Sequence, residues 1–146
     1  MPSSSSIRFF YEDVSFKLDH PQKTIDWLTN IVQQEFSEIS FINYIFCSDQ
    51  YLLEINKSRL GHDYYTDIIT FDQSDTSAIE ADIFISIERV IENAADEKVN
   101  LNHEIRRVMI HGVLHLLDFA DKTKIQKSEM RKKEDSCLSL YRFKSQ

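Results

Sequence analysis

The chain has 146 residues, 42% hydrophobic and 28% charged, which is enough to bury a core and predicts one domain over residues 1–146. Two Gly and two Pro are too few for an all-β architecture built on many tight turns. The net charge of −7 argues against indiscriminate nucleic-acid binding, and no apolar run reaches the roughly 18–20 residues of a membrane helix.

The predicted elements follow from apolar periodicity and from turn and cap residues. In chain order they are a flexible tail at 1–6, one or two strands at 7–18, a helix at 20–36, a strand at 39–48, a helix at 48–60, a loop at 61–66, strands at 67–71 and 79–86 joined by a polar connection at 73–77, and helices at 86–99, from Asn102 through His115, and at 123–143. This mixture predicts an α+β fold of at most three layers.

Several positions within these elements carry more specific predictions. Pro21 suits the first turn of its helix, Ser48 or Asp49 is expected to cap the next, and Asn102 the helix with the two histidines. Two sets of apolar residues at helical spacing are expected to face the core. They are Ile87, Val90, Ile91 and Ala94, and Ile125, Met130, Cys137, Leu138 and Tyr141.

Charge and cysteine content bear on location and partners. Residues 1–100 carry 7 Lys/Arg and 18 Asp/Glu, whereas residues 101–146 carry 10 and 6, so the last third has room for an anion-binding face. A solvated helix surface explains that charge equally well. The N-terminus shows no secretory pattern, and Cys47 and Cys137 have no C-x-x-C spacing, which predicts free thiols in a reducing cytoplasm.

The sequence HGVLHLLDFAD at residues 111–121 carries the candidate site. His111 and His115 are one turn apart on a helix that is apolar on nearly all sides, so they share a face. Buried imidazoles need partners, which are either a carbonyl or carboxylate for each ring or one metal ion for both. The i, i+4 spacing favours the metal, because it lets two ring nitrogens converge on one ion.

Asp121 is the candidate third ligand. If the helix continued, Asp121 would lie about 15 Å along the axis from His111, so the chain must leave the helix near residues 118–120 and turn back. Asp118 tolerates the left-handed conformation that such a turn requires, and it is also the rival third ligand.

Gly112 argues against one class of zinc enzyme. It stands where an H-E-x-x-H peptidase carries its general base, which makes a peptidase the weakest option. Glycine within a helix costs about 1 kcal/mol relative to alanine, so a close approach by a strand or by a substrate backbone is expected here.

These residues resemble the YbeY family of bacterial endoribonucleases, whose motif is H-G-x-L-H-L-x-G-Y-D-H. The matching positions, which extend over roughly residues 40–121, are His111, Gly112, Leu114, His115 and Leu116, then Asn56, Gly61, Asp63, Thr66, Asp67, Ile68, Ile69, Thr70 and Phe71 upstream, and Asp82, Ile83, Ile85 and Ser86 between them. Asp121 replaces a family histidine, Asp118 a family glycine, and Leu60 a family arginine, with Arg59 one position earlier.

The resemblance implies a mostly parallel four-stranded sheet with one antiparallel strand and about five helices. It implies a metal-dependent, single-strand-specific endoribonuclease that matures the 3′ end of the small-subunit ribosomal RNA and supports ribosome quality control. The implied partners are ribosomal RNA and the small ribosomal subunit, without membrane or DNA.

The resemblance also implies a ligand set of His111, His115 and Asp121 around one zinc ion, and the aspartate makes another divalent metal acceptable. Arg59 and Asp67 are the candidate catalytic residues. Asp82 is a further candidate base, although either aspartate could instead be a strand-end or capping carboxylate.

Lys122 and Lys124 are candidate phosphate-binding residues, with solvated charge as the alternative. His62 is a candidate cleft residue, and Trp27 is expected in the core rather than under a nucleobase.

Two alternative functions remain at this point. Two histidines and one carboxylate also form the facial triad of non-haem Fe(II) oxygenases. The other alternative is a non-catalytic, ribosome-associated module in which the metal only braces the fold.

Overall fold

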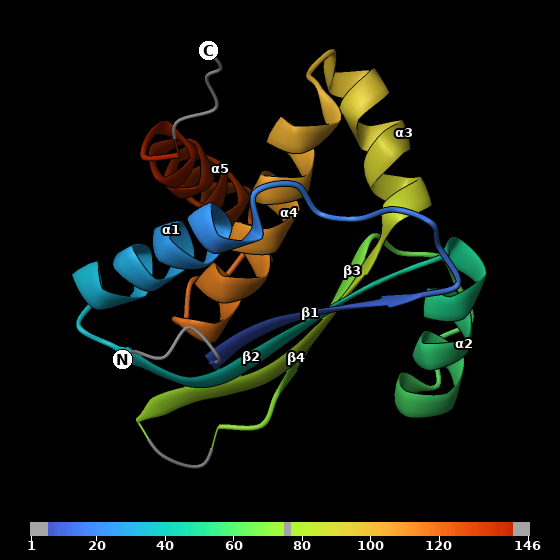
Figure 1. The fold of residues 1–146 in the computed structure, drawn as a ribbon, viewed down its shortest axis with the longest axis horizontal. Coiled ribbons are helices and arrows are strands. Elements are labelled where there is room, and N and C mark those ends of the chain that lie inside the picture. Colours follow the sequence, from blue (N-terminus) through green and yellow to red (C-terminus); the bar gives the residue numbers. More distant parts are fainter. Residues whose placement is uncertain (1–5, 75–76, 142–146) are drawn as a thin grey trace.

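Four strands and five helices make up the part of the chain that a computed structural model describes, residues 6–74 and 77–141 (Figure 1). In chain order they are β1 (Ile7–Glu12), α1 (Pro21–Gln34), β2 (Glu38–Cys47), α2 (Asp49–Leu60), β3 (Ile68–Asp72), β4 (Ala78–Ser86), α3 (Ile87–Glu97), α4 (Leu101–Leu116) and α5 (Lys124–Ser139). The order agrees with the sequence-based prediction. Of the predicted tail, residues 1–5 lie outside the described residues.

The strands form one mixed sheet in the order β1-β2-β4-β3. β1 pairs with β2 and β2 with β4 in parallel, whereas β3 pairs with β4 antiparallel. The predicted fold class, with a single antiparallel strand, is therefore confirmed. Along the central strands β2 and β4, one face is apolar and buried in the main core, whereas the other face is buried mainly near the carboxyl ends, at Cys47 and Phe84.

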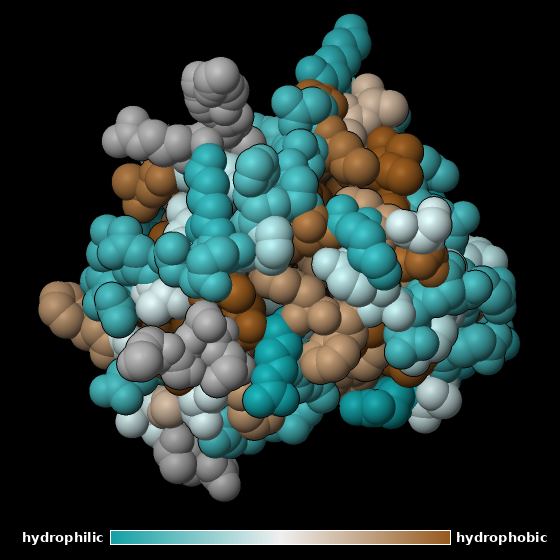
Figure 2. All heavy atoms as spheres, in the orientation of Figure 1, coloured by the Kyte–Doolittle hydropathy of each residue, from teal (hydrophilic) through white to brown (hydrophobic). Residues whose placement is uncertain are grey.

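Successive side chains of each strand point to opposite faces of the sheet, and this divides the core into two clusters. On one face Tyr44 and Ile83 belong to the main cluster with α1, α4 and α5, which gather on one side of the sheet in Figure 1. On the other face Phe84 packs with Leu52 of α2 in a smaller cluster. Figure 2 shows hydrophilic side chains spread over one face of the molecule, with smaller hydrophobic areas between them.

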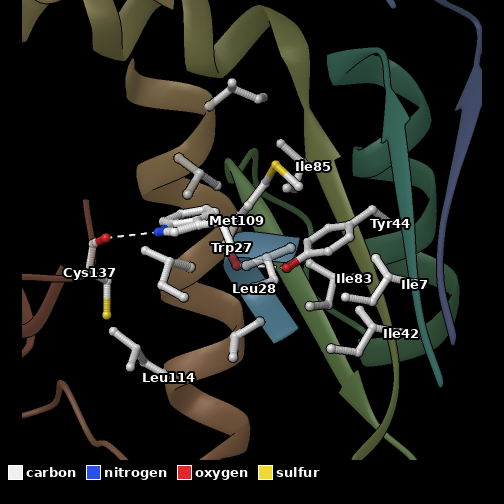
Figure 3. Close-up of a cluster of buried hydrophobic side chains, with 14 of the residues drawn as sticks. Ile7, Trp27, Leu28, Ile42, Tyr44, Ile83, Ile85, Met109, Leu114 and Cys137 are labelled. Carbon is white, nitrogen blue, oxygen red and sulfur yellow. Dashed lines mark hydrogen bonds between the residues drawn. The ribbon is translucent and has the colours of Figure 1, made fainter. Parts of the chain in front are cut away.

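Helix α4 is the most deeply buried helix and lies against the sheet. The hydroxyl of Tyr44 donates to the carbonyl of Met109 at 3.0 Å, which fixes α4 on β2. Trp27 is 6% exposed, and its indole N–H donates to the carbonyl of Cys137 at 2.9 Å, which ties α1 to α5 (Figure 3). Trp27 is thus a core residue, as predicted, and Cys47 and Cys137 are buried free thiols.

The structure confirms one of two predicted helix caps and moves the other by two residues. Ser48 is the N-cap of α2, and its side chain accepts from the backbone N–H of Tyr51 at 3.0 Å. The prediction of Asn102 as the cap of α4 is wrong: Asn100 has the extended backbone that a cap requires and accepts from the N–H of His103 at 2.8 Å. The helix therefore begins at Leu101, and Asn102 falls in its first turn.

Two residues predicted to face the core are exposed instead. Ile91 is 49% exposed because α3 buries the stripe of Ile87, Val90 and Ala94, and Ile91 lies beside it. Ile125 is 76% exposed in the first turn of α5, ahead of the buried stripe that begins at Met130. Among the described residues, no helix combines the length and apolar character needed to cross a bilayer.

Candidate metal centre

The chain reverses direction directly after α4. Asp118 adopts the left-handed conformation, with φ of 72°, and the N–H of Phe119 returns to the carbonyl of Leu114 at 2.9 Å. This is the turn that the sequence predicted for Asp118, and it brings Asp121 back beside the end of the helix. Asp118 itself lines a different depression, next to Glu35 and Asp72, and is not part of the ligand group.

The reversal brings His111, His115 and Asp121 together. The Nε2 atoms of the two histidines are 3.1 Å apart, and each is 3.4 Å from Oδ2 of Asp121. Bonds of about 2.0–2.1 Å to a tetrahedral ion separate ligand atoms by roughly 3.3–3.4 Å. The three atoms therefore have the spacing of three tetrahedral ligands, so these side chains fit a divalent metal, with one position left for water or substrate.

Glu134 of α5 sets the orientation of His111. The Nδ1–H of His111 donates to Oε2 of Glu134 at 2.6 Å, which leaves the Nε2 lone pair directed toward Asp121 and His115. Burial opposes charge on His111, but the hydrogen bond to Glu134 and the charges of Glu134, Asp121 and Asp67 outweigh it and raise the pKa of His111. A carboxylate behind a ligating histidine is the usual device for fixing its tautomer.

Glu134 is itself held by a buried arginine. Nη1 of Arg107 lies 3.2 Å from Oε1 of Glu134 and 3.2 Å from Oδ1 of Asp135, and its Nε donates to Glu104 at 3.3 Å. Each oxygen of Glu134 thus has its own donor. Sequence reasoning missed this residue, although Met130, Glu134 and Leu138 share one stripe of α5, and a carboxylate on a buried stripe indicates a buried partner.

The three candidate ligands open onto a cleft of about 580 Å³. Its walls come from the end of α2, the loop before β3, β3 itself and the end of α4. Asp67 lines this cleft, and its Oδ2 accepts from the side-chain amide of Asn93 at 3.1 Å. His62 also lines the cleft, as the sequence suggested. Leu60 stands in the cleft wall at the position of the family arginine.

The other predicted site residues lie outside the lining of this cleft. The guanidinium of Arg59 lies over the ring of Phe71, 4.4 Å from its centroid. Lys122 and Lys124 are exposed and follow Asp121 in the chain. Asp82 accepts hydrogen bonds from Asn43 of β2 at 3.0 Å and from Gln73, just after β3, at 2.8 Å, which supports its structural role over that of a base.

Gly112 allows α4 to approach the sheet, as predicted. A Cβ atom at this position would lie 3.2 Å from side-chain atoms of Ile68, Thr70 and Ile83. The approaching neighbours are therefore β3 and β4. The close packing keeps the ligand helix against β3, which forms the facing wall of the cleft.

Comparisons with known sequences lead to one family. The family described as Endoribonuclease YbeY matches residues 7–142. Proteins named Endoribonuclease YbeY include one from Cytophaga hutchinsonii, 49% identical over 94% of this chain and 97% of its own length. Those from Flavobacterium psychrophilum (94% and 98%) and Porphyromonas gingivalis (94% and 91%) are 47% and 36% identical.

A solved structure supports the fold. The solution structure of TM1509 from Thermotoga maritima superposes with a TM-score of 0.66 over 91% of this chain and 88% of its own. Its sequence is 24% identical, so this likeness bears on the fold alone.

Proposed function

The chain belongs to the YbeY family of endoribonucleases, and on that premise we propose that it hydrolyses phosphodiester bonds of single-stranded RNA in ribosomal RNA maturation. The observation that carries the proposal is the convergence of His111, His115 and Asp121 at 3.1–3.4 Å on the rim of a cleft. The family match does not favour the oxygenase and the structural-metal alternatives.

We assign the metal to these three side chains, with zinc as the expected ion. Their nitrogen and oxygen donors are ligands that zinc accepts, and Asp121 also tolerates a harder divalent ion. Once bound, such an ion supplies a water activated near neutral pH and polarises a phosphoryl oxygen. His111 contributes its Nε2 lone pair because Glu134 holds the proton on Nδ1.

Asp67 is the proposed proton acceptor in this reaction. Its carboxylate lines the same cleft as the ligands and is oriented by the amide of Asn93, which supports the assignment. Lys122 and Lys124 are the proposed contacts to flanking phosphates, because both are exposed cations next to Asp121 in the chain. Arg59 remains a proposed phosphate contact that would have to leave the ring of Phe71.

We further propose that residues 1–146 act as one catalytic domain in the cytoplasm, on the 3′ end of the small-subunit RNA and in contact with the small ribosomal subunit. The basic last third of the chain supports an RNA-facing surface there.

The test combines metal analysis with RNA cleavage. Wild-type protein should carry about one metal equivalent and cleave a short unstructured RNA, and a chelator should abolish cleavage until zinc is restored. His111→Ala and Asp121→Ala should lose both metal and cleavage, whereas Asp118→Asn should keep both. Cleavage retained by His111→Ala would contradict the proposal, and iron with consumption of a 2-oxo acid would favour the oxygenase.

A further inference from the structure

The charge of the cleft raises the question of how it holds RNA. Among the described residues that line it, none is Lys or Arg, and three are aspartates, Asp67, Asp72 and Asp121. Only Asp121 belongs to the ligand group. Contacts between Lys or Arg and phosphate normally supply much of the affinity for nucleic acid. Affinity inside this cleft must therefore come largely from other contacts.

Two aromatic rings form part of the cleft wall. The rings of His62 and Tyr64 stack with centroids 5.2 Å apart and an interplanar angle of 18°, and the Tyr64 hydroxyl lies 3.0 Å from Nδ1 of His62. Tyr64 is 55% exposed, so this pair is not part of the core. The exposed rings lie in the same cleft as the three metal ligands.

A buried asparagine fixes the loop that carries these rings. Asn56 is 2% exposed, and its side-chain amide donates to the backbone carbonyl of Tyr64 at 2.9 Å. The backbone carbonyl of Asn56 accepts from the backbone N–H of His62 at 3.1 Å. Gly61 ends α2 in the left-handed conformation, with φ of 69°, and starts the loop. The ring pair is therefore presented with little conformational freedom left to lose on binding.

We propose that the His62–Tyr64 pair is a stacking platform for one nucleobase of the RNA strand whose phosphate reaches the metal ligands. This inference rests on the proposed function and names how that site recognises its substrate. Every base has a π face, so stacking tolerates any sequence. A base in a duplex has both faces covered by its neighbours, so the platform selects unpaired RNA.

The test is a double-mutant cycle that combines a change in the protein with a change in the RNA substrate. Steady-state cleavage is measured on a short unstructured RNA and on versions with one abasic nucleotide at successive positions around the cleaved phosphate. Tyr64→Ala should raise KM about 5- to 100-fold, with kcat within about threefold of wild type. An abasic nucleotide at one position should raise the KM of wild type by a similar factor, and should not raise the KM of Tyr64→Ala any further. Tyr64→Phe should keep most of the affinity.

Tyr65→Ala is the matched control. Tyr65 is the adjacent tyrosine and 48% exposed, but it does not line the cleft and lies beside the guanidinium of Arg89, 5.1 Å from its ring centroid. The KM of Tyr65→Ala should equal that of wild type. An unchanged KM in Tyr64→Ala would overturn the platform. So would an abasic nucleotide that, at every position, raises the KM of Tyr64→Ala by the same factor as the KM of wild type.

A binding measurement separates this inference from the proposed function. The same RNA with 2-aminopurine at the sensitive position should show fluorescence quenching with wild type and little with Tyr64→Ala. If wild type cleaves no RNA, 2-aminopurine is scanned along the strand instead. The lack of cleavage then refutes the nuclease, and quenching that wild type shows and Tyr64→Ala loses keeps the platform. Equal quenching in wild type and Tyr64→Ala at every position refutes the platform whether or not the RNA is cleaved.

Discussion

Replacing Glu134 by Gln tests whether the second carboxylate prepares His111 for metal. Glu134 offers two acceptors, one to Nδ1 of His111 at 2.6 Å and one to Nη1 of Arg107 at 3.2 Å. Glutamine keeps one acceptor and replaces the other by N–H donors. With its oxygen toward His111, two N–H donors meet at Arg107. With its oxygen toward Arg107, the amide donates to Nδ1, and the ring proton moves to Nε2, where the metal belongs.

Either arrangement weakens metal binding. Loss of such a partner typically lowers metal affinity about 10- to 100-fold, which is about 1.4–2.7 kcal/mol. The mismatched buried donor should also lower the free energy of unfolding of the metal-free protein by about 1–3 kcal/mol. The assays are competition for zinc with a coloured chelator and urea unfolding followed by circular dichroism.

Asp135→Asn is the matched control for this change. Asp135 also lies 3.2 Å from Nη1 of Arg107, but its side chain is 60% exposed and the described contacts do not link it to His111. Its metal affinity should stay within about twofold of wild type, and its stability within about 1 kcal/mol. If Glu134→Gln binds zinc as tightly as this control while His111→Ala does not bind it, the tautomer argument is refuted.

Four further variants test the packing, the capping and the buried thiols. Gly112→Val should lower the free energy of unfolding by about 1–3 kcal/mol, because its side chain meets β3 and β4; an unchanged urea midpoint would contradict the close approach. Asn100→Ala should cost about 1 kcal/mol and Asn102→Ala less than about 0.5 kcal/mol in the same unfolding assay; the reverse order would place the cap at Asn102. Burial raises the pKa of Cys47 to about 12 and of Cys137 to about 11, from 9.0. As pH rises above 9, the unfolded state releases thiol protons that the folded state keeps, so these thiols should lower stability between pH 8 and pH 10, and a Cys47→Ala/Cys137→Ala double variant should lose less stability over that range than wild type.

Features set by neighbouring residues were predictable. The strands, the helices and the order in which they occur followed from apolar periodicity, because a period near two or near 3.6 is a local property of the chain. His111 and His115 had to share a face for the same reason. The left-handed turn at Asp118 followed from the need to leave the helix and from the tolerance of aspartate for that conformation.

Faces and caps were predictable only in part. Ile91 and Ile125 have helical spacing with buried residues, yet both are exposed because none of the described elements covers their side of the helix. Asn100 and Asn102 have the same side chain, and the extended backbone at Asn100 makes that residue the cap of α4.

By itself, the sequence determined the helix that carries the two histidines, the spacing of those histidines and the strand pattern of an α+β domain. Only the tertiary structure decided that Asp121 lies 3.4 Å from both imidazoles, that Glu134 stands behind His111, and that His62 and Tyr64 line the same cleft as these candidate ligands. The physical reason is the separation of the interacting residues along the chain. Backbone geometry fixes neighbours within a turn or two of helix, whereas contacts between α4, α5 and the loop before β3 depend on how whole elements pack around a shared core.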